Sequence, residues 1–322
     1  MSSQPVLTDY REQLGPAIKN GLKYLESLYD RKPWPFSCVS YSETREVFTE
    51  DYESKHKGYD EVFTHYLALL LIGEYFSPAI KERLIESTLP KDFGAARYWI
   101  SYEALPCDTD TTSLAYCAFL KLNVVTGSDV KEIARKIFAN KTPKGTVDLF
   151  FDPVIKYKNI YDAGAMVNVL ILASLLKQEE EVRVTEDFVF NWLTSGQWKN
   201  GTLFYHTPLM FPYYVSALSK SSERAETRFK PYLLQAVQDF SPKFPLDFAF
   251  KKLILANLNL EESDDIPELD RALLNMQRDD GSWPADGAWG HWDKKYWGGE
   301  AISTIFAIAA LITSVKESIA VE

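Results

Sequence analysis

Two kinds of predicted helix alternate along the chain, and this alternation restricts the fold more than any other feature of the sequence. One kind is amphipathic, with a charged face, and covers residues 9–29, 78–88, 127–139, 183–195, 222–239 and 266–278. The other kind is apolar on nearly all sides and covers residues 59–76, 109–122, 161–176, 206–219, 246–258 and 299–316. A helix that is apolar all round is buried all round, whereas an amphipathic helix keeps one face in water. The order therefore predicts an inner ring of buried helices inside an outer ring.

The helical pairs repeat at intervals of roughly 45–60 residues, and the repeats are divergent. The segments that connect them carry Gly, Pro and aromatic residues, and none has the composition of a domain boundary. We therefore expect one all-α domain over residues 1–322, built as an (α/α)6 barrel of six helical hairpins. Its buried helices would line a central well, and the long connecting segments would lie at the face where those helices begin.

Composition narrows the choice of partners and compartment. The chain has 45 acidic and 35 basic residues, for a formal charge of −10, which argues against nucleic acid as a partner. Cys38, Cys107 and Cys117 form neither a CxxC pair nor an even disulfide framework, and the N-terminus has no signal pattern, so a cytoplasmic location is expected. The longest uncharged apolar stretch, 301–315, is shorter than the ~20 residues of a spanning helix. The sequence leaves open the alternative of a peripheral contact with a membrane surface.

The last repeat contains the spacing QxxxGxW, in Gln277, Gly281 and Trp283. Weaker copies lie at Trp34 and around residues 198–201. This spacing resembles the QW motif of squalene–hopene and oxidosqualene cyclases, and of class II terpene cyclases generally. In that family the glutamine caps a neighbouring helix and the tryptophan stacks over the glutamine. The resemblance therefore implies that these residues are structural staples.

The pentad DTDTT, residues 108–112, begins the second apolar helix. It resembles the DxDD motif that starts an inner barrel helix in class II terpene cyclases, in the DxDTT variant of drimane-type sesquiterpene cyclases. The family's middle aspartate protonates the substrate. The resemblance implies that Asp110 is the general acid, oriented by Asp108 and Thr111, of a cyclase that acts on a linear isoprenoid, a polyene or a prenylated molecule. The alternative is that the pentad only caps its helix, because Asp and Thr are common N-cap residues.

Protonation of an alkene requires an acid that is still protonated when the substrate arrives. Burial and a neighbouring carboxylate both raise a carboxyl pKa, whereas a helix N-terminus lowers it. We expect Asp108 and Asp110 to titrate as a coupled pair. A histidine contacts the catalytic aspartate in squalene cyclases, and His206 is the candidate for that role here. The alternative for His206 is a helix cap or an ordinary core residue.

A carbocation can be stabilised by aromatic faces, at ~0.5–2 kcal/mol for each well-placed ring. The chain has 8 Trp, 18 Tyr and 19 Phe, more than core filling needs. Asp162 and Asp247 also begin apolar helices, where they would be N-caps or charge stabilisers in the well. The alternative for each of the candidate aromatic rings given next is that it belongs to the hydrophobic core. The candidate rings near the starts of the apolar helices are Tyr59, Phe63, Tyr161, Tyr205, Phe211, Phe248, Trp289, Trp292 and Trp297.

We expect neither a metal site nor a cofactor. The stretch SDDIPELD, residues 263–270, superficially resembles the aspartate-rich motif of class I terpene synthases, but its Pro267 favours an acidic helix start. No Cys–His spacing supports the zinc site of a protein prenyltransferase. Mg²⁺ would be needed only for a diphosphate substrate. The lysines that could hold such a group are Lys57, Lys156, Lys158, Lys294 and Lys295.

Two rival functions use the same barrel. A sugar-active enzyme would place two carboxylates in an aromatic cleft, pairing Asp108 or Asp110 with Asp162 or Asp247. A non-catalytic protein would bind an apolar ligand and perform no chemistry. A deep apolar well with one acid favours the cyclase, and an open cleft rich in hydrogen-bonding groups favours the sugar-active enzyme.

Overall fold

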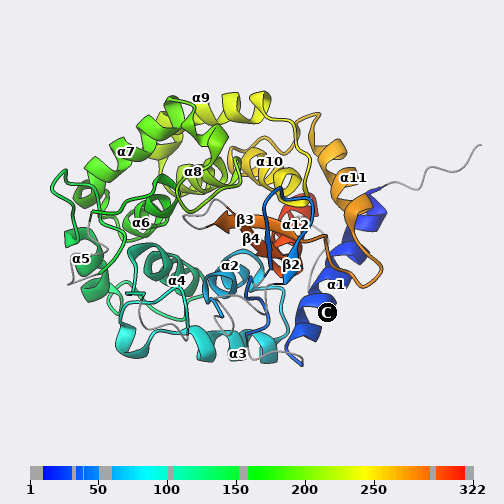
Figure 1. Cartoon of the computed structure of the whole chain (residues 1–322), viewed down its shortest axis with the longest axis horizontal. Coiled ribbons are helices and arrows are strands. Elements are labelled where there is room, and N and C mark those ends of the chain that lie inside the picture. Colours follow the sequence, from blue (N-terminus) through cyan, green and yellow to red (C-terminus); the bar gives the residue numbers. More distant parts are fainter. Residues whose placement is uncertain are drawn as a thin grey trace, which may run out of the picture.

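The computed structural model of the protein describes residues 10–30, 34–38, 40–50, 60–100, 105–151, 159–290 and 295–315. Its helices form two concentric rings, seen end-on in Figure 1. The inner ring consists of α2 (Phe63–Ile72), α4 (Thr109–Lys121), α6 (Ala163–Leu175), α8 (Met210–Ser221), α10 (Pro245–Asn257) and α12 (Glu300–Ile312). The outer ring consists of α1 (Arg11–Leu28), α3 (Pro78–Thr88), α5 (Lys131–Ala139), α7 (Arg183–Thr194), α9 (Glu223–Asp239) and α11 (Ile266–Met276). The predicted (α/α)6 barrel is confirmed.

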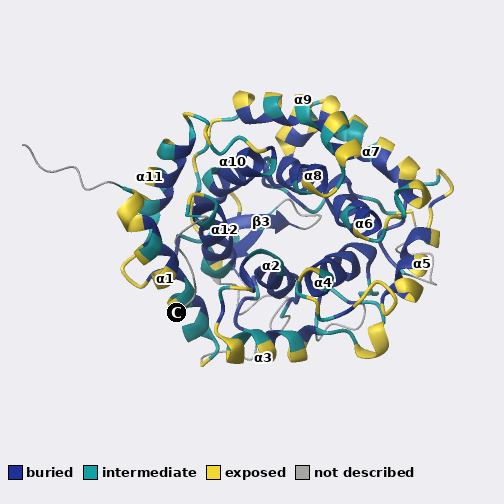
Figure 2. Cartoon of the chain, turned by 180° about the vertical axis from the view of Figure 1, so that it is seen from behind, coloured by how far each residue is buried: buried dark blue, intermediate teal, exposed yellow. Residues whose placement is uncertain are grey.

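The burial of each ring follows from its residue pattern. The inner helix α6 is buried at every position from Ala163 to Leu170, because its sequence is apolar on all sides. The outer helix α5 buries only Ile133, Ala134, Ile137 and Phe138, which lie on one stripe. Figure 2 shows the same division, with dark inner helices and outer helices that are exposed on their outward faces. Consecutive inner helices contact one another, and α12 contacts α2, so the inner ring is closed.

A small antiparallel sheet, which the sequence did not predict, covers one end of the barrel (Figure 1). The described strands lie in the order β2-β1-β4-β3. Strand β4 runs directly into α12, so the sheet lies where the inner helices begin. These strands are two to five residues long, too short for a periodic pattern to reveal. Their bounds are β1 (Ser40–Ser42), β2 (Thr49–Glu50), β3 (Asp286–Gly290) and β4 (Tyr296–Gly299).

The QxxxGxW segment joins the connection between α11 and α12 to helix α1. Gln277 donates through Nε2 to the carbonyl of Ala17 in α1, at 2.8 Å. Gly281 has φ +89°, and a Cβ there would lie 2.4 Å from the carbonyl oxygen of Asn20 in α1. Trp283 is fully buried and donates through Nε1 to the carbonyl of Leu273. These contacts make the segment a connector between the first and last helical pairs.

One ion pair is buried between helices. Lys252 of α10 and Asp270 of α11 form it, and both side chains are completely buried. Ser314, just beyond α12, contacts both members of the pair at 2.8 Å. The pair therefore links three helices in the last third of the chain. No helix in the described parts of the chain has the length and apolar character needed to cross a membrane.

Candidate active site

The pentad at residues 108–112 forms the start of α4, and most of its polar groups hold the backbone. Asp108 is the N-cap residue, and its Oδ1 accepts from the backbone N–H of Thr111 at 2.6 Å. Thr109 and Thr112 bind backbone groups of the two neighbouring loops. Asp110 is left as the one pentad side chain that reaches toward other inner helices. Thr111, which was predicted to orient Asp110, instead donates its backbone N–H to the N-cap residue Asp108.

Two hydrogen-bond donors hold Asp110, one from the inner helix α6 and one from the segment that precedes α8. Its Oδ1 accepts from Nδ2 of Asn168 in α6 at 2.7 Å, and its Oδ2 accepts from the hydroxyl of Tyr205 at 2.5 Å. Asp110 is only 7% exposed. Tyr205 was predicted as a lining ring, and Asn168 was not predicted. A signal for Asn168 was present, because it is a lone amide in an otherwise apolar helix.

The surroundings of Asp110 favour its protonated form. Burial, followed by the adjacent Asp108 carboxylate, raises the pKa of Asp110 well above its ordinary value. The hydrogen bonds from Tyr205 and Asn168 act in the opposite direction, because they stabilise the carboxylate. Burial raises the pKa of Asp108 to about 7, against the lowering effect of its bond from Thr111. In the described parts of the chain, Oδ2 of Asp108 has no hydrogen-bond partner.

Tyr205 is held in place by the neighbouring start of α6. Asp162 caps α6, and its two carboxylate oxygens also accept from the hydroxyl of Thr202 and the backbone N–H of Phe204, each at 3.0 Å. The hydroxyl of Thr202 accepts in turn from the backbone N–H of Tyr205 at 3.1 Å. Gly164 lies against the ring, since a Cβ there would be 2.4 Å from Cδ2 of Tyr205. Asp162 therefore acts as an N-cap that also positions the segment carrying Tyr205.

Several predicted rings lie together beside Asp110. The ring of Phe63, at the start of α2, lies 6.3 Å from that of Tyr205 and 5.6 Å from that of Trp289, between centroids. Trp297 is the cross-strand partner of Trp289. Tyr98, which was not predicted, lies 6.1 Å from Phe63 and 6.4 Å from Trp289. The two tryptophans come from the unpredicted sheet, which covers the end of the barrel where the inner helices begin.

The structure does not bring His206 to Asp110, so the predicted contact between them is wrong. Nε2 of His206 lies 3.1 Å from the carbonyl oxygen of Leu203, and the imidazole packs edge-on against the ring of Tyr296. The residue that reaches Asp110 is Tyr205, which directly precedes His206 in the chain. Successive side chains in an extended turn point in different directions, which explains the one-residue error.

Other predicted residues lie apart from this cluster or outside the described residues. The ring of Tyr161 contacts Phe188 of the outer helix α7 at 5.2 Å, so it faces the outer layer and is corrected to a packing residue. Phe211 and Phe248 belong to the hydrophobic packing of α8 and α10. The predicted residues that lie outside the described ones are Tyr59 and Trp292.

The remaining charged candidates contact other residues or lie outside the described residues. Asp247 forms an ion pair with Arg45, so it is not free in the well. Nζ of Lys295 lies 4.7 Å from the ring centroid of Tyr41. Within the described ranges, no group of three or more His, Cys, Asp or Glu side chains is placed to hold a metal ion. The other predicted diphosphate ligands lie outside these ranges: Lys57, Lys156, Lys158 and Lys294.

Comparison with solved structures shows that this barrel has the class II terpene cyclase fold. The chain is similar to the type II terpene cyclase MstE from Scytonema in complex with its product merosterolic acid A, with TM-score 0.61 and 15% identity over 97% of this chain and 99% of that chain. MstE in complex with the substrate geranylgeranyl dihydroxybenzoate gives TM-score 0.63 and 15% identity over 95% and 99%. The ent-copalyl diphosphate synthase from Streptomyces platensis gives TM-score 0.54 and 14% identity, over 78% of this chain and 50% of that chain. No protein-family model and no curated protein matches the sequence.

Proposed function

We propose that the protein is a class II terpene cyclase, which starts cyclisation of an isoprenoid chain by protonating it. The observation that carries this proposal is the environment of Asp110. It is a buried carboxyl with a strongly raised pKa, held by two donors and flanked by a second carboxyl and by aromatic rings. An N-cap alone needs one accepting side chain, and Asp108 already supplies it.

The geometry supports a defined first step. The Asp110 carboxyl gives its proton to one carbon of a terminal double bond, so a C–H bond forms from the π electrons and the other carbon becomes cationic. The carboxylate that remains keeps the hydrogen bonds from Asn168 and Tyr205, which stabilise it as charge develops. Burial keeps the acid protonated beforehand, and the donors strengthen it at the moment of transfer.

The later steps need protection of a cation from water and bases. Further double bonds attack the cation in turn, and the positive charge moves along the chain. The faces of Phe63, Tyr205 and Trp289 would stabilise that charge without forming a bond to it. The sequence ends when a proton is lost to a base or when water adds and then loses a proton. The net reaction is an isomerisation in the first case and a hydration in the second.

The substrate class is proposed from the structural neighbours. MstE has been solved with geranylgeranyl dihydroxybenzoate, a prenylated aromatic acid. We therefore place a prenylated aromatic compound first among the substrates to test, with farnesyl and geranylgeranyl diphosphate beside it. A diphosphate would call for Mg²⁺ and for the lysines named above, whereas the aromatic compound would not.

The sugar-active alternative has less support from the described contacts. It requires a second free carboxylate to act with Asp108 or Asp110. Asp162 and Asp247 have both carboxylate oxygens engaged, in helix capping, loop bonds and an ion pair. Neither is free to activate water. The apolar-ligand binder differs from the cyclase only in lacking turnover, so product analysis separates the two.

The test is incubation of the purified protein with the prenylated aromatic compound, with both diphosphates and with squalene-like polyenes, followed by product analysis. Asp110→Asn should abolish turnover and leave the circular dichroism spectrum unchanged. Asp279→Asn, at an exposed position, is the matched control and should retain full activity. Turnover by Asp110→Asn, or the absence of any product from the unmodified protein, would overturn the proposal.

A further inference from the structure

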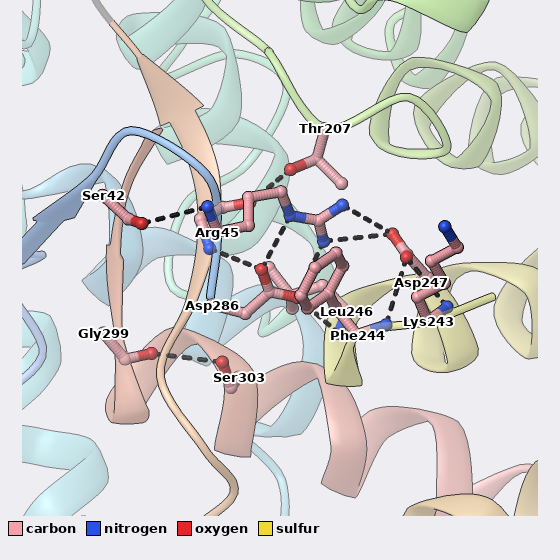
Figure 3. A network of polar contacts seen from close by, with 11 residues as sticks. Ser42, Arg45, Thr207, Lys243, Phe244, Leu246, Asp247, Asp286, Gly299 and Ser303 are labelled. Carbon is pink, nitrogen blue, oxygen red and sulfur yellow. Dashed lines mark hydrogen bonds and ion pairs between the residues drawn. The ribbon is translucent and has the colours of Figure 1, made fainter. Parts of the chain in front are cut away.

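A single arginine connects the strand pair β1–β2 to the wall of the barrel (Figure 3). Residues 43–47, between these strands, are exposed except for Arg45, which is 6% exposed. Its guanidinium donates through Nε and Nη2 to the two oxygens of Asp286 in β3, at 2.9 and 2.8 Å. Nη1 and Nη2 donate to Oδ1 of Asp247 in α10, both at 3.0 Å. One buried cation from an exposed loop is thus placed between two buried carboxylates.

The two carboxylates form a socket, in which each is also held by backbone donors other than Arg45. Asp247 accepts through Oδ2 from two backbone N–H groups that precede α10, both at 3.2 Å. Asp286 accepts from two further backbone N–H groups, at 2.7 and 3.0 Å. The ring of Phe244 forms one side of the socket, 4.4 Å from Cζ of the guanidinium. The donating residues all belong to the barrel or to β3: Lys243, Phe244, Leu246 and Gly287.

The hairpin that carries Arg45 pairs with the rest of the sheet over only a few residues. Strand β1 pairs with β4 over three residues and with β2 over two. Arg45 itself has φ +68°, in the left-handed region that non-glycine residues seldom adopt. Its backbone N–H donates to the hydroxyl of Ser42, which fixes the turn locally at 2.9 Å. Within the described residues, Arg45 is therefore the side chain that joins this short hairpin to the wall of the barrel.

The hairpin also supplies the outer member of an aromatic row on the sheet. Tyr41 of β1 is paired with Trp297 of β4, and Trp297 is paired with Trp289 of β3. Paired residues of adjacent strands project from the same face of a sheet. Trp289 contacts Phe63 at the start of α2, and Phe63 contacts Tyr205, so this face looks toward the Asp110 cluster. Movement of the hairpin would remove Tyr41 and uncover Trp297.

We propose that the β1–β2 hairpin is a gate over the barrel opening, and that Arg45 latches it shut in the socket of Asp247 and Asp286. In the cyclase reaction the latch determines how the cation ends. With the gate shut, water is excluded, and the cation gives a proton from an adjacent carbon to a base, so that the electrons of that C–H bond form an alkene. With the gate open, water forms a C–O bond to the cation and then loses a proton to give an alcohol. The statement about products rests on the proposed function, whereas the gate itself does not.

Hydrogen–deuterium exchange of the full chain tests the gate without any substrate. Arg45→Gln removes the charge and keeps most of the side-chain length, and Arg135→Gln, an exposed arginine of α5, is the control. Amides of residues 40–50 and 296–299 should exchange at least tenfold faster in Arg45→Gln, with no change in peptides from α6. Unchanged exchange in residues 40–50, or equally faster exchange throughout the barrel, would overturn the gate.

The unmodified protein supplies a second measurement in case Arg45→Gln does not fold. Residues 40–50 should open locally, so their amides should exchange faster than those of α6 at every pH tested. Exchange of both segments only through global unfolding would contradict a gate. Arg45→Lys keeps the charge and loses the two-pronged geometry, so its exchange should lie between the unmodified protein and Arg45→Gln.

Product analysis in ¹⁸O-labelled water tests the latch's effect on chemistry. Arg45→Gln should raise the ratio of ¹⁸O-containing alcohol to alkene at least threefold over the unmodified protein and over Arg135→Gln. If exchange shows the gate but this ratio is unchanged, the role of Arg45 in excluding water is wrong. If the unmodified protein forms no product from any polyene, the proposed function fails, and the exchange result alone decides the gate.

Discussion

Gly164 leaves room for the ring of Tyr205, so Gly164→Ala is a sharp test of how Asp110 is positioned. The added Cβ would lie 2.4 Å from Cδ2 and 3.1 Å from Cε2 of Tyr205. Ordinary contacts between carbon atoms are about 3.5–4.0 Å, so the ring has to retreat by about 1 Å. The hydrogen bond from Tyr205 to Asp110, 2.5 Å in the native protein, would then lengthen to about 3.5 Å and be lost.

The expected loss is mainly in rate and only modestly in stability. Misplacement of a catalytic group by about 1 Å costs up to about 10²-fold in rate, so kcat should fall between about 10- and 100-fold. Overpacking costs about 1–3 kcal/mol of unfolding free energy. Replacement of glycine by alanine inside a helix returns about 1 kcal/mol, which leaves a net loss of about 0–2 kcal/mol.

The assay compares Gly164→Ala, Tyr205→Phe and the double variant over a range of pH. As the acid of the proposed reaction, Asp110 would act in its protonated form, so we expect activity to fall as pH rises through its pKa. The Tyr205 hydroxyl lowers that pKa, so both single variants should move this fall to higher pH. If Gly164 acts only through Tyr205, the double variant should be no slower than Tyr205→Phe. Native kcat in Gly164→Ala, or losses that multiply in the double variant, would refute the reasoning.

Three further predictions concern stability. Burial raises to about 7 the pKa of Asp108 and of Glu61, a fully buried residue two positions before α2. The folded protein therefore binds protons that the unfolded chain loses above about pH 4. The free energy of unfolding, measured by urea titration, should therefore fall as pH rises from 4.5 to 8. Asp108→Asn keeps the helix cap and should make this fall less steep. An equally steep fall in the variant would contradict the prediction. Trp283→Ala removes a fully buried ring and should cost about 3–5 kcal/mol by the same titration, and a loss below 1 kcal/mol would count against its role as a connector. Lys252→Met leaves the buried Asp270 without its ion-pair partner and should lower the free energy of unfolding by about 3–5 kcal/mol. Adding Asp270→Leu should recover most of that loss. If the single and double variants are equally stable, the broken ion pair is not the cause of the loss.

The helical rings were predictable because burial directly selects side-chain type. A helix such as α6, surrounded by protein, is apolar at nearly every position, and an outer helix such as α5 is apolar on one stripe. The sheet left no comparable pattern. Strand β3 has the sequence DGAWG, and its neighbour β4 has YWGG, so glycine replaces the alternation that marks a strand. Their pairing with β1 depends on residues far away in the sequence.

The candidate acid was predictable in part, because helix capping and barrel position are both local properties. Asp108 and Asp110 lie where their motif suggested, at the start of a buried inner helix. Their partners depend on tertiary packing. Tyr205 reaches Asp110 only because Asp162 holds the segment before α8 and because Gly164 has no side chain. No spacing in the sequence distinguishes Tyr205 from His206 for that contact.

The contact between Arg45 and Asp286 joins residues 241 positions apart. During synthesis at about 5–20 residues per second, the arginine would wait roughly 10–50 s for its partner to emerge. The two parts of the sheet are therefore separated in time as well as in sequence, and the loop that their pairing closes contains nearly the whole barrel. We expect the inner helices to assemble around an open end, and the cover of that end to form last. A nascent barrel would thus position Asp110 before the proposed gate could exclude water from it.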